Sequence, residues 1–309
     1  MEVVLAVALP FFALIFTGMA AGRTRLLEGT STRPLNTFVF YFALPALLLS
    51  GTAEMAAADI LRPALFLSWL LPALLLFFTT WLGLRWLFGR SAGEGAIQAL
   101  VATFGNVGFV GLPLVVTAMG THVLPAAMVV IIVDSAIMIA VATAIIEWER
   151  DEGSGFRRAL RTAGLGVARN PLVIASAVGV TLALLSLSLP APLLRYLELL
   201  GAAAGPTALF ALGITLARQP VRSAGPEVAI LVAAKLLIHA PVVWLATWLL
   251  GLDGPLQTAL VILATLPVAA NVHVLAQRYG LYAGPTSTAI LISTVLSMVT
   301  VSLALSLLL

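Results

Sequence analysis

The sequence predicts an all-α protein that crosses a membrane several times. Of its 309 residues, 61% are hydrophobic and 9% are charged, and its mean hydropathy is +1.11. A soluble domain would carry about 25% charged residues. The apolar residues form runs of about 20, which is the helix length that spans a bilayer. We predict ten transmembrane helices, arranged as two inverted repeats of five, with broken and crossing fourth and ninth helices.

Ten apolar runs place the expected helices. The first five runs cover residues 3–21, 34–51, 63–84, 96–119 and 123–146, and the last five cover 168–187, 191–217, 226–250, 256–278 and 283–307. The longest polar stretch, residues 147–169, separates the two sets and is rich in arginine. We therefore expect a first repeat at 1–147, a cytoplasmic linker at 148–167 and a second repeat at 168–309.

The arginines predict the orientation, because cytoplasmic loops are enriched in Lys and Arg. With the linker inside, thirteen arginines fall in cytoplasmic loops and two, Arg62 and Arg195, fall outside. Both termini should then face outward from a bacterial inner membrane. The pI near 9.8 follows from this topology, so no nucleic-acid partner is expected.

The two halves also match each other in sequence. Prolines and glycines recur at offsets of 161 or 160 residues: Pro10 and Pro171, Gly18 and Gly179, Pro45 and Pro206, Gly120 and Gly280, Pro125 and Pro285. Because five is odd, the second copy must enter the membrane in the opposite direction. Inverted repeats of this kind are typical of secondary transporters, whose binding site lies at the repeat interface.

Two corresponding segments interrupt their helices. Residues 104–114 read F-G-N-V-G-F-V-G-L-P-L, and residues 265–273 read T-L-P-V-A-A-N-V-H. At membrane depth, such breaks persist only where protein or a water-filled cavity surrounds them. The half-helix N-termini they create favour anions. The predicted substrate-binding residues are Asn106, Gly108, Gly111, Pro113, Pro267, Asn271 and Lys235. The alternative is that Pro and Gly are simply frequent in membrane helices.

Ionisable residues inside the spans are the candidates for coupling or gating. Asp134 lies in the fifth span and could bind a coupling ion, pair with Lys235 or face a lumen. Lys235, the single lysine, suits an anion pathway or a bond to a backbone carbonyl. His239 follows Lys235 at i+4 on the same helix face. His273 is either a proton carrier or a packing residue.

The sequence resembles the auxin efflux carrier family, which includes bacterial carriers of malate and malonate and plant auxin exporters. The residues that carry this resemblance are Leu9 to Phe12, Gly18, Gly22, Leu35 to Pro45, Asn106 to Pro113, Asn170-Pro171, Gly205 to Gly213, Lys235, Leu266-Pro267, Ala276 and Tyr279. The resemblance covers essentially the whole chain. It implies a scaffold domain and carboxylate binding where the broken helices cross. Plant members carry a proline shortly before the first Asn, where this chain has Phe104-Gly105, so auxin is not the expected substrate.

We therefore expect a secondary transporter of small mono- or dicarboxylates, such as malate or malonate, that works by alternating access. A sodium-coupled symporter of the bile-acid type, a non-transporting ligand sensor and a channel are the alternatives. A cation antiporter is disfavoured because Asn106 and Asn271 are neutral, whereas that class places acidic groups beside its breaks.

Enzyme chemistry is not expected. No sequence context joins a nucleophilic serine to a His or Lys base. The chain has no cysteine and no metal-ligand spacing of His and carboxylates. The expected partners are a small organic carboxylate and membrane lipid. The sequence leaves open a homodimer and the coupling ion, H⁺ or Na⁺, and it predicts no cofactor.

Overall fold

The computed structural model describes residues 9–24, 32–55, 62–150, 164–165, 168–218 and 225–309. Within them the fold is helical, and a single isolated antiparallel bridge joins Gly105 to Val268. Six described helices are long and apolar enough to cross a membrane, and four apolar helices are shorter. The protein is therefore an all-helical, multi-pass membrane protein.

The helices of the first half follow the apolar runs closely. They are α1 (Leu9–Arg23), the continuous α2 (Thr32–Phe38), η2 (Val39–Ala43) and α3 (Leu44–Ala53), then α5 (Pro63–Phe88), α6 (Ala92–Thr103), η3 (Val107–Gly111) with α7 (Leu112–Met119), and η4 (Thr121–Val123), α8 (Leu124–Ile132), η5 (Val133–Met138) and α9 (Ile139–Arg150). The elements η2 and η5 are π-helical turns inside longer helices, and η3 is a π-helical turn that begins the η3–α7 helix.

The second half is built in the same way. Its helices are α11 (Pro171–Leu184), α12 (Ala191–Ala202), α13 (Ala204–Arg218), the continuous α14 (Pro226–Ala233), η6 (Ala234–Ile238) and α15 (His239–Leu249), then α16 (Gly254–Ala264), α17 (Ala270–Tyr279) and α18 (Ala283–Leu308). Asparagine and proline start α11, because Asn170 caps it and Pro171 lacks an N–H that would need a partner. Gly280, at φ 68°, ends α17.

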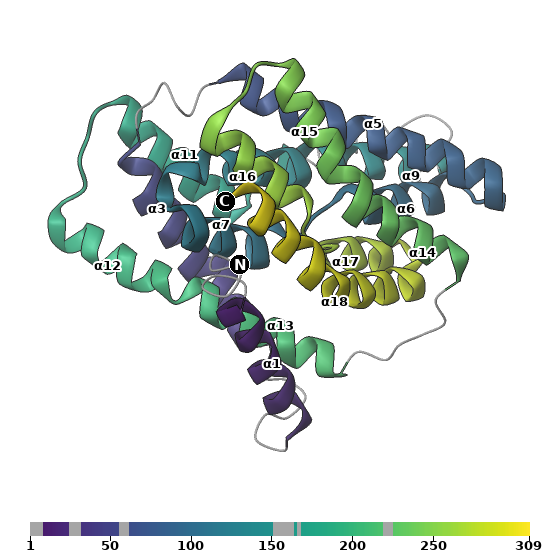
Figure 1. Ribbon diagram of the computed structural model, residues 1–309, viewed down its shortest axis with the longest axis horizontal. Helices are drawn as coiled ribbons and strands as arrows, with labels where there is room; N and C mark the ends of the chain where they lie inside the picture. Colours follow the sequence, from purple (N-terminus) through teal and green to yellow (C-terminus); the bar gives the residue numbers. More distant parts are fainter. Residues whose placement is uncertain (1–8, 25–31, 56–61, 151–163, 166–167, 219–224) are drawn as a thin grey trace.

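The helices gather into two bundles (Figure 1). In the first bundle α1 packs along α13, and α3 packs on α11 and α12. The second bundle joins α5 to α6 and α15, α9 to α6, and α14 and α17 to α18. The broken helices α6–α7 and α16–α17 run through the middle of the molecule. This arrangement places the helix breaks beside the boundary between the bundles.

Helix α9 continues to Arg150, beyond the predicted end at residue 146. The extra turn has partners that are distant in the sequence. The Glu149 carboxylate accepts the backbone N–H groups of Ala92 (2.8 Å) and Gly93 (2.7 Å), at the positive end of α6. Arg150 also donates to the Tyr279 carbonyl. The rest of the predicted linker, 151–163 and 166–167, lies outside the described residues.

A buried carboxylate joins three elements of the second bundle. Glu227, in the first turn of α14, accepts hydrogen bonds from Arg90 (2.7 Å), Gln98 (2.9 Å) and the Tyr282 hydroxyl (2.9 Å). Burial raises the pKa of that hydroxyl, so Tyr282 stays protonated and donates. Because the pairing partners come from the α5–α6 connection, α6 and the start of α18, this network holds the second bundle together.

Glycines set the close approach of α1 to α13. A Cβ on Gly18 would lie 2.1 Å from the Phe210 carbonyl oxygen, and one on Gly213 would lie 2.0 Å from the Ile15 carbonyl oxygen. Membrane helices have no hydrophobic force between them, so small residues that let the backbones touch supply the packing energy. The two helices therefore depend on glycine at both positions.

Substituting either glycine should loosen this contact. We expect Gly18→Ala or Gly213→Ala to lower the free energy of unfolding by about 1 to 3 kcal/mol, the usual cost of overpacking. Thermal melting of the purified protein in detergent measures the effect. Gly83→Ala is the matched control, since nothing lies within 4 Å of a Cβ there. Equal melting temperatures for all three variants would contradict the packing role.

Candidate functional site

The two helix breaks pair with each other through their backbones. Between α6 and η3, Asn106 N–H donates to the Pro267 carbonyl (2.8 Å), and Ala269 N–H donates to the Phe104 carbonyl (3.1 Å). The Val268 N–H donates to the Ser293 hydroxyl at 3.1 Å. Backbone N–H and C=O groups that lack helical partners at the two breaks therefore bond to each other or to Ser293. A membrane interior requires such partners, because no water is present to supply them.

A cavity of about 50 Å³ lies beside this pairing. It is lined by both breaks, by η5 and by the start of α11, through residues that include Phe104 to Phe109, Ala269 to Asn271, Asp134, Ser135, Asn170, Leu172, Phe40 and Ile131. Asn106 is buried, with 7% of its surface exposed, whereas Asn271 is more open. No described residue forms a hydrogen bond with either side-chain amide. Both amides are free to bind a ligand.

The two half-helices that leave the breaks also begin at this cavity. The η3–α7 segment starts directly after Asn106, and α17 starts at Ala270, next to Asn271. No side chain caps either start. A helix N-terminus carries unpaired N–H groups and the positive end of the helix dipole, so each start favours a negative group.

Asp134 places a carboxylate on the cavity wall. It is 3% exposed, and its Oδ1 accepts a hydrogen bond from Trp69 Nε1 at 2.9 Å. Its Oδ2 has no hydrogen-bond partner among the described residues. A buried oxygen without a donor is costly, so this atom is a candidate for proton or ligand contact.

Lys235 lies behind the breaks, outside the residues that line the cavity. It is fully buried, donates to the Ala264 carbonyl at 2.8 Å and lies 3.2 Å from His239 Nδ1. Ala264 is the last residue of α16, and the negative end of the helix dipole at that point favours a cation. Lys235 and Asp134 form no direct ion pair in the described part of the chain.

The structure separates the predicted residues into two groups. Asn106, Gly108, Asn271 and Asp134 meet at the cavity. Gly111 instead packs against Leu266, whose Cδ1 would lie 2.4 Å from an added Cβ. The other residues that do not line the cavity are Pro113, Pro267, Lys235, His239 and His273.

Each of these outlying residues has a visible packing or bonding role. Pro113 lies against Gly205 of α13, 3.1 Å from the position of an added Cβ. Pro267 supplies its carbonyl to the paired breaks. His273 Nδ1 lies 3.0 Å from the Ala283 carbonyl. The ring of His239 packs on Trp69, with centroids 5.0 Å apart.

Three residues with hydrogen-bonding side chains at or next to the cavity were not predicted as site residues: Trp69, Ser135 and Asn170. Trp69 is part of the site because it donates a hydrogen bond to Asp134, which is 65 residues away in the sequence. No local sequence pattern predicts such a bond. Asn170 was visible in the sequence as Asn before Pro, a typical helix start. Its position at the cavity follows from how α11 packs, which the local pattern does not reveal.

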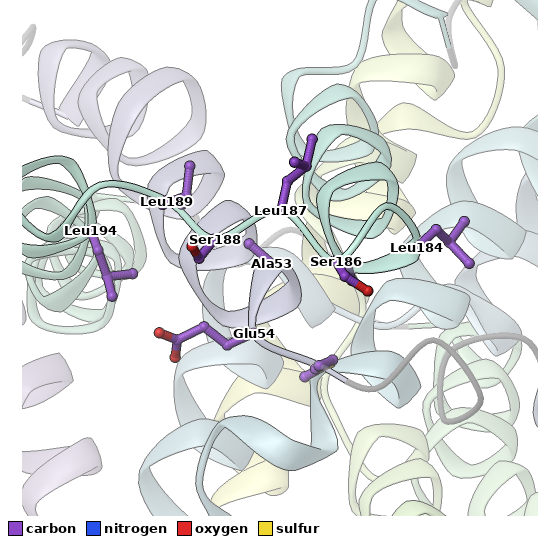
Figure 2. Close-up of a pocket in the computed structure, with 10 residues that line it drawn as sticks. Ala53, Glu54, Leu184, Ser186, Leu187, Ser188, Leu189 and Leu194 are labelled. Atoms are coloured by element: carbon purple, nitrogen blue, oxygen red, sulfur yellow. The ribbon is translucent and has the colours of Figure 1, made fainter.

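A larger cavity, of about 460 Å³, lies away from the breaks. Figure 2 shows Glu54 at the end of α3 below the Ser188 and Leu189 backbone, with Ser186 farther along the same connection. The described residues that line it include no basic side chain. Because its single charged group is a carboxylate, this cavity is a poor match for an anion.

Comparison with known proteins agrees with the geometry. A family model described as membrane transport protein matches residues 3–305. A protein of Rhizobium meliloti (strain 1021) named "Putative malonate transporter" is 36% identical over 314 residues, covering 98% of this chain and 95% of that protein. A protein of Escherichia coli (strain K12) named "Uncharacterized transporter YfdV" is 27% identical over 297 residues, covering 94% and 93%.

The family match spans nearly the whole chain, and the names of both relatives are those of transporters and not of enzymes. The helices that can cross a membrane agree with that match. The chain belongs to the membrane transport protein family, the auxin efflux carrier family, and is a multi-pass membrane transporter.

Proposed function

We propose that this transporter is a secondary carrier that moves small organic carboxylates, such as malonate or malate, by alternating access. The observation that carries the proposal is the pair of unpartnered amides, Asn106 and Asn271, in one cavity at the paired helix breaks. Each amide can donate to a carboxylate oxygen. The N-termini of η3–α7 and α17 add the positive ends of two helix dipoles.

The size of the cavity favours a short acid. About 50 Å³ holds roughly three to five water-sized groups, since one water needs about 10 to 15 Å³ of such space, so the cavity must widen even for the seven non-hydrogen atoms of malonate. A steroid acid would require a much larger opening, so the bile-acid type of symporter has less support. The relative from Rhizobium meliloti, which is 36% identical to this chain, is named as a malonate transporter, and this name also favours malonate.

We further propose the ten-helix, inverted-repeat architecture in a bacterial inner membrane. The breaks between α6 and η3 and between α16 and α17 fall in the fourth and ninth predicted spans. The backbones of the two breaks pair in antiparallel orientation. This is the orientation expected of two segments that are related by a pseudo-twofold axis in the membrane plane. The first bundle would be the scaffold, and the second bundle, with both breaks, would move against it.

Uptake by proteoliposomes tests the function directly. Radiolabelled malonate should accumulate inside vesicles that contain the protein and not in empty vesicles. Binding without accumulation would favour the ligand sensor. Loss of uptake when sodium is replaced by potassium would favour a sodium symporter. Uptake that does not saturate with malonate concentration would favour the channel.

Orientation can be tested in this cysteine-free chain. If the linker faces the cytoplasm, Ser154→Cys on intact cells should resist a membrane-impermeant thiol reagent, whereas Ser188→Cys in the exposed α11–α12 connection should be labelled. The reason is the enrichment of arginine in cytoplasmic loops. Permeabilised cells provide the control, since both positions should then react. The reverse labelling pattern would overturn the proposed orientation.

Asp134 and Lys235 are proposed to take part in the transport cycle and not simply in folding. Asp134→Asn and Lys235→Gln should express as monodisperse protein and lose most malonate uptake, because each removes one charge beside the crossover. Glu198→Gln is the matched control: its carboxylate belongs to an exposed ion pair with Arg195 on α12 and should be dispensable. Wild-type uptake by both test variants across pH and sodium concentration would reassign the two residues to packing.

The crossover amides should determine affinity. A hydrogen bond to a charged group contributes about 1.5 to 3 kcal/mol, so Asn106→Ala or Asn271→Ala should weaken malonate binding by about ten- to a hundredfold. Aspartate at either position should be worse, because it sets one anion beside another. Affinity is measured by titration calorimetry, with thermal melting as the fold check.

Gln257→Ala is the matched control for these amides. Gln257 is in α16, where its amide donates to Thr247 at 2.9 Å, outside the cavity. Its loss should leave malonate affinity unchanged. If aspartate at both Asn106 and Asn271 binds malonate as tightly as asparagine in folded protein, the carboxylate lies elsewhere. Lys235 would then be the leading alternative.

A further inference from the structure

Asn170 presents a third amide to the cavity. Its Oδ1 caps α11 by accepting the Leu172 N–H at 2.9 Å. This bond fixes the orientation of the side chain. The Nδ2 group of Asn170 donates to no acceptor among the described residues. Asn170 is half-buried and lines the same cavity as Asn106 and Asn271.

The start of α11 is also close to the crossover. Leu172 Cδ1 lies 3.8 Å from the position of a Cβ on Gly108, so the first turn of α11 lies against η3. The 14-residue α11 begins with Pro171 and has no acidic residue in its first turn. Its positive dipole end therefore faces the region that the two breaks already make favourable for anions.

A second observation, at a residue outside α11, also points to a ligand. The Asn106 side chain is buried, with 7% exposed, yet no described residue bonds to its amide. The structure thus brings three amides from three separate segments to a cavity of about 50 Å³. One carboxylate has two oxygens and about four acceptor sites, so two amides can hold one carboxylate, and the third amide is available to another polar group of the same ligand.

We propose that Asn170 and the first turn of α11 form a second carboxylate subsite, which makes the carrier prefer short dicarboxylates to monocarboxylates. This inference rests on the proposed function. Asp134 explains why the extra donor matters, since its carboxylate lines the same cavity and its Oδ2 has no hydrogen-bond partner among the described residues. A second carboxylate that faced Asp134 without a donor would be repelled. Asn170 supplies that donor on a wall built from another helix.

Two substitutions separate the cap from the donor. Serine and aspartate are good N-caps, so Asn170→Ser and Asn170→Asp should keep α11 folded while they remove the amide Nδ2. The probes are malonate and propionate, which share three carbons and differ by one carboxylate. Titration calorimetry on the purified full-length protein gives the affinity of each variant for each acid.

The wild-type protein should bind malonate more tightly than propionate. Asn170→Ser should weaken malonate binding by about ten- to a hundredfold, the range for one lost hydrogen bond to a charged group, and leave propionate binding unchanged. Asn170→Asp should weaken malonate binding further, because it adds a negative charge. Ser91→Ala is the control: it removes the cap of α6, away from the cavity, and should leave the preference intact.

The outcomes are distinguishable. If wild-type protein binds neither acid, the proposed function fails and the subsite fails with it. If wild-type protein binds malonate and Asn170→Ser keeps the full preference for malonate over propionate, only the subsite is overturned. An equal loss of both acids in folded Asn170→Ser would also overturn it, because the residue would then serve the shared carboxylate.

Discussion

The backbone pairing of the two breaks is the interaction on which the rest of the molecule depends. Helical hydrogen bonds cannot be lost at membrane depth without replacement, since each unpaired group costs several kcal/mol. Here residues 104–106 and 267–269 replace them by bonding to each other. This pairing forces two helices from opposite halves of the sequence to meet at their midpoints.

Neighbouring side chains form hydrogen bonds with further backbone groups at the breaks. Lys235 donates to the carbonyl of Ala264 at the end of α16, and the Ser293 hydroxyl accepts the Val268 N–H. Both come from helices of the second bundle. The breaks are therefore held by one bundle and open toward the other, whose Phe40 and Asn170 complete the cavity wall. A relative displacement of the bundles would change the cavity while leaving the paired breaks intact, as our proposal of alternating access requires.

The bundles are held together by different chemistry. In the first, Gly18 and Gly213 let α1 and α13 touch along their backbones, which leaves little freedom for either helix to slide. In the second, polar bonds around Glu227 and Glu149 tie helix ends together. Glycine packing suits a fixed support. Bonds at the ends of the helices hold a group of helices together and leave its middle free for the broken segments.

The sequence by itself determined the class, the approximate bounds of most helices and the two breaks. Apolar runs, arginine-rich loops and the segments 104–114 and 265–273 are local patterns, and each acts through the cost of placing polar groups in lipid. The described helices follow those runs within a few residues at most ends. The amides Asn106 and Asn271 were predictable for the same reason, because each lies next to a local breaker.

Only the tertiary structure decided the partners of the remaining residues. The bond from Trp69 to Asp134, the bond from Lys235 to Ala264 and the last turn of α9 each depend on residues that are far away in the sequence. Composition shows that a buried charge needs a partner, and it does not show which one. Asn170 is the clearest case: its sequence context predicts a helix cap, and its place at the cavity depends on the packing of α11 against η3.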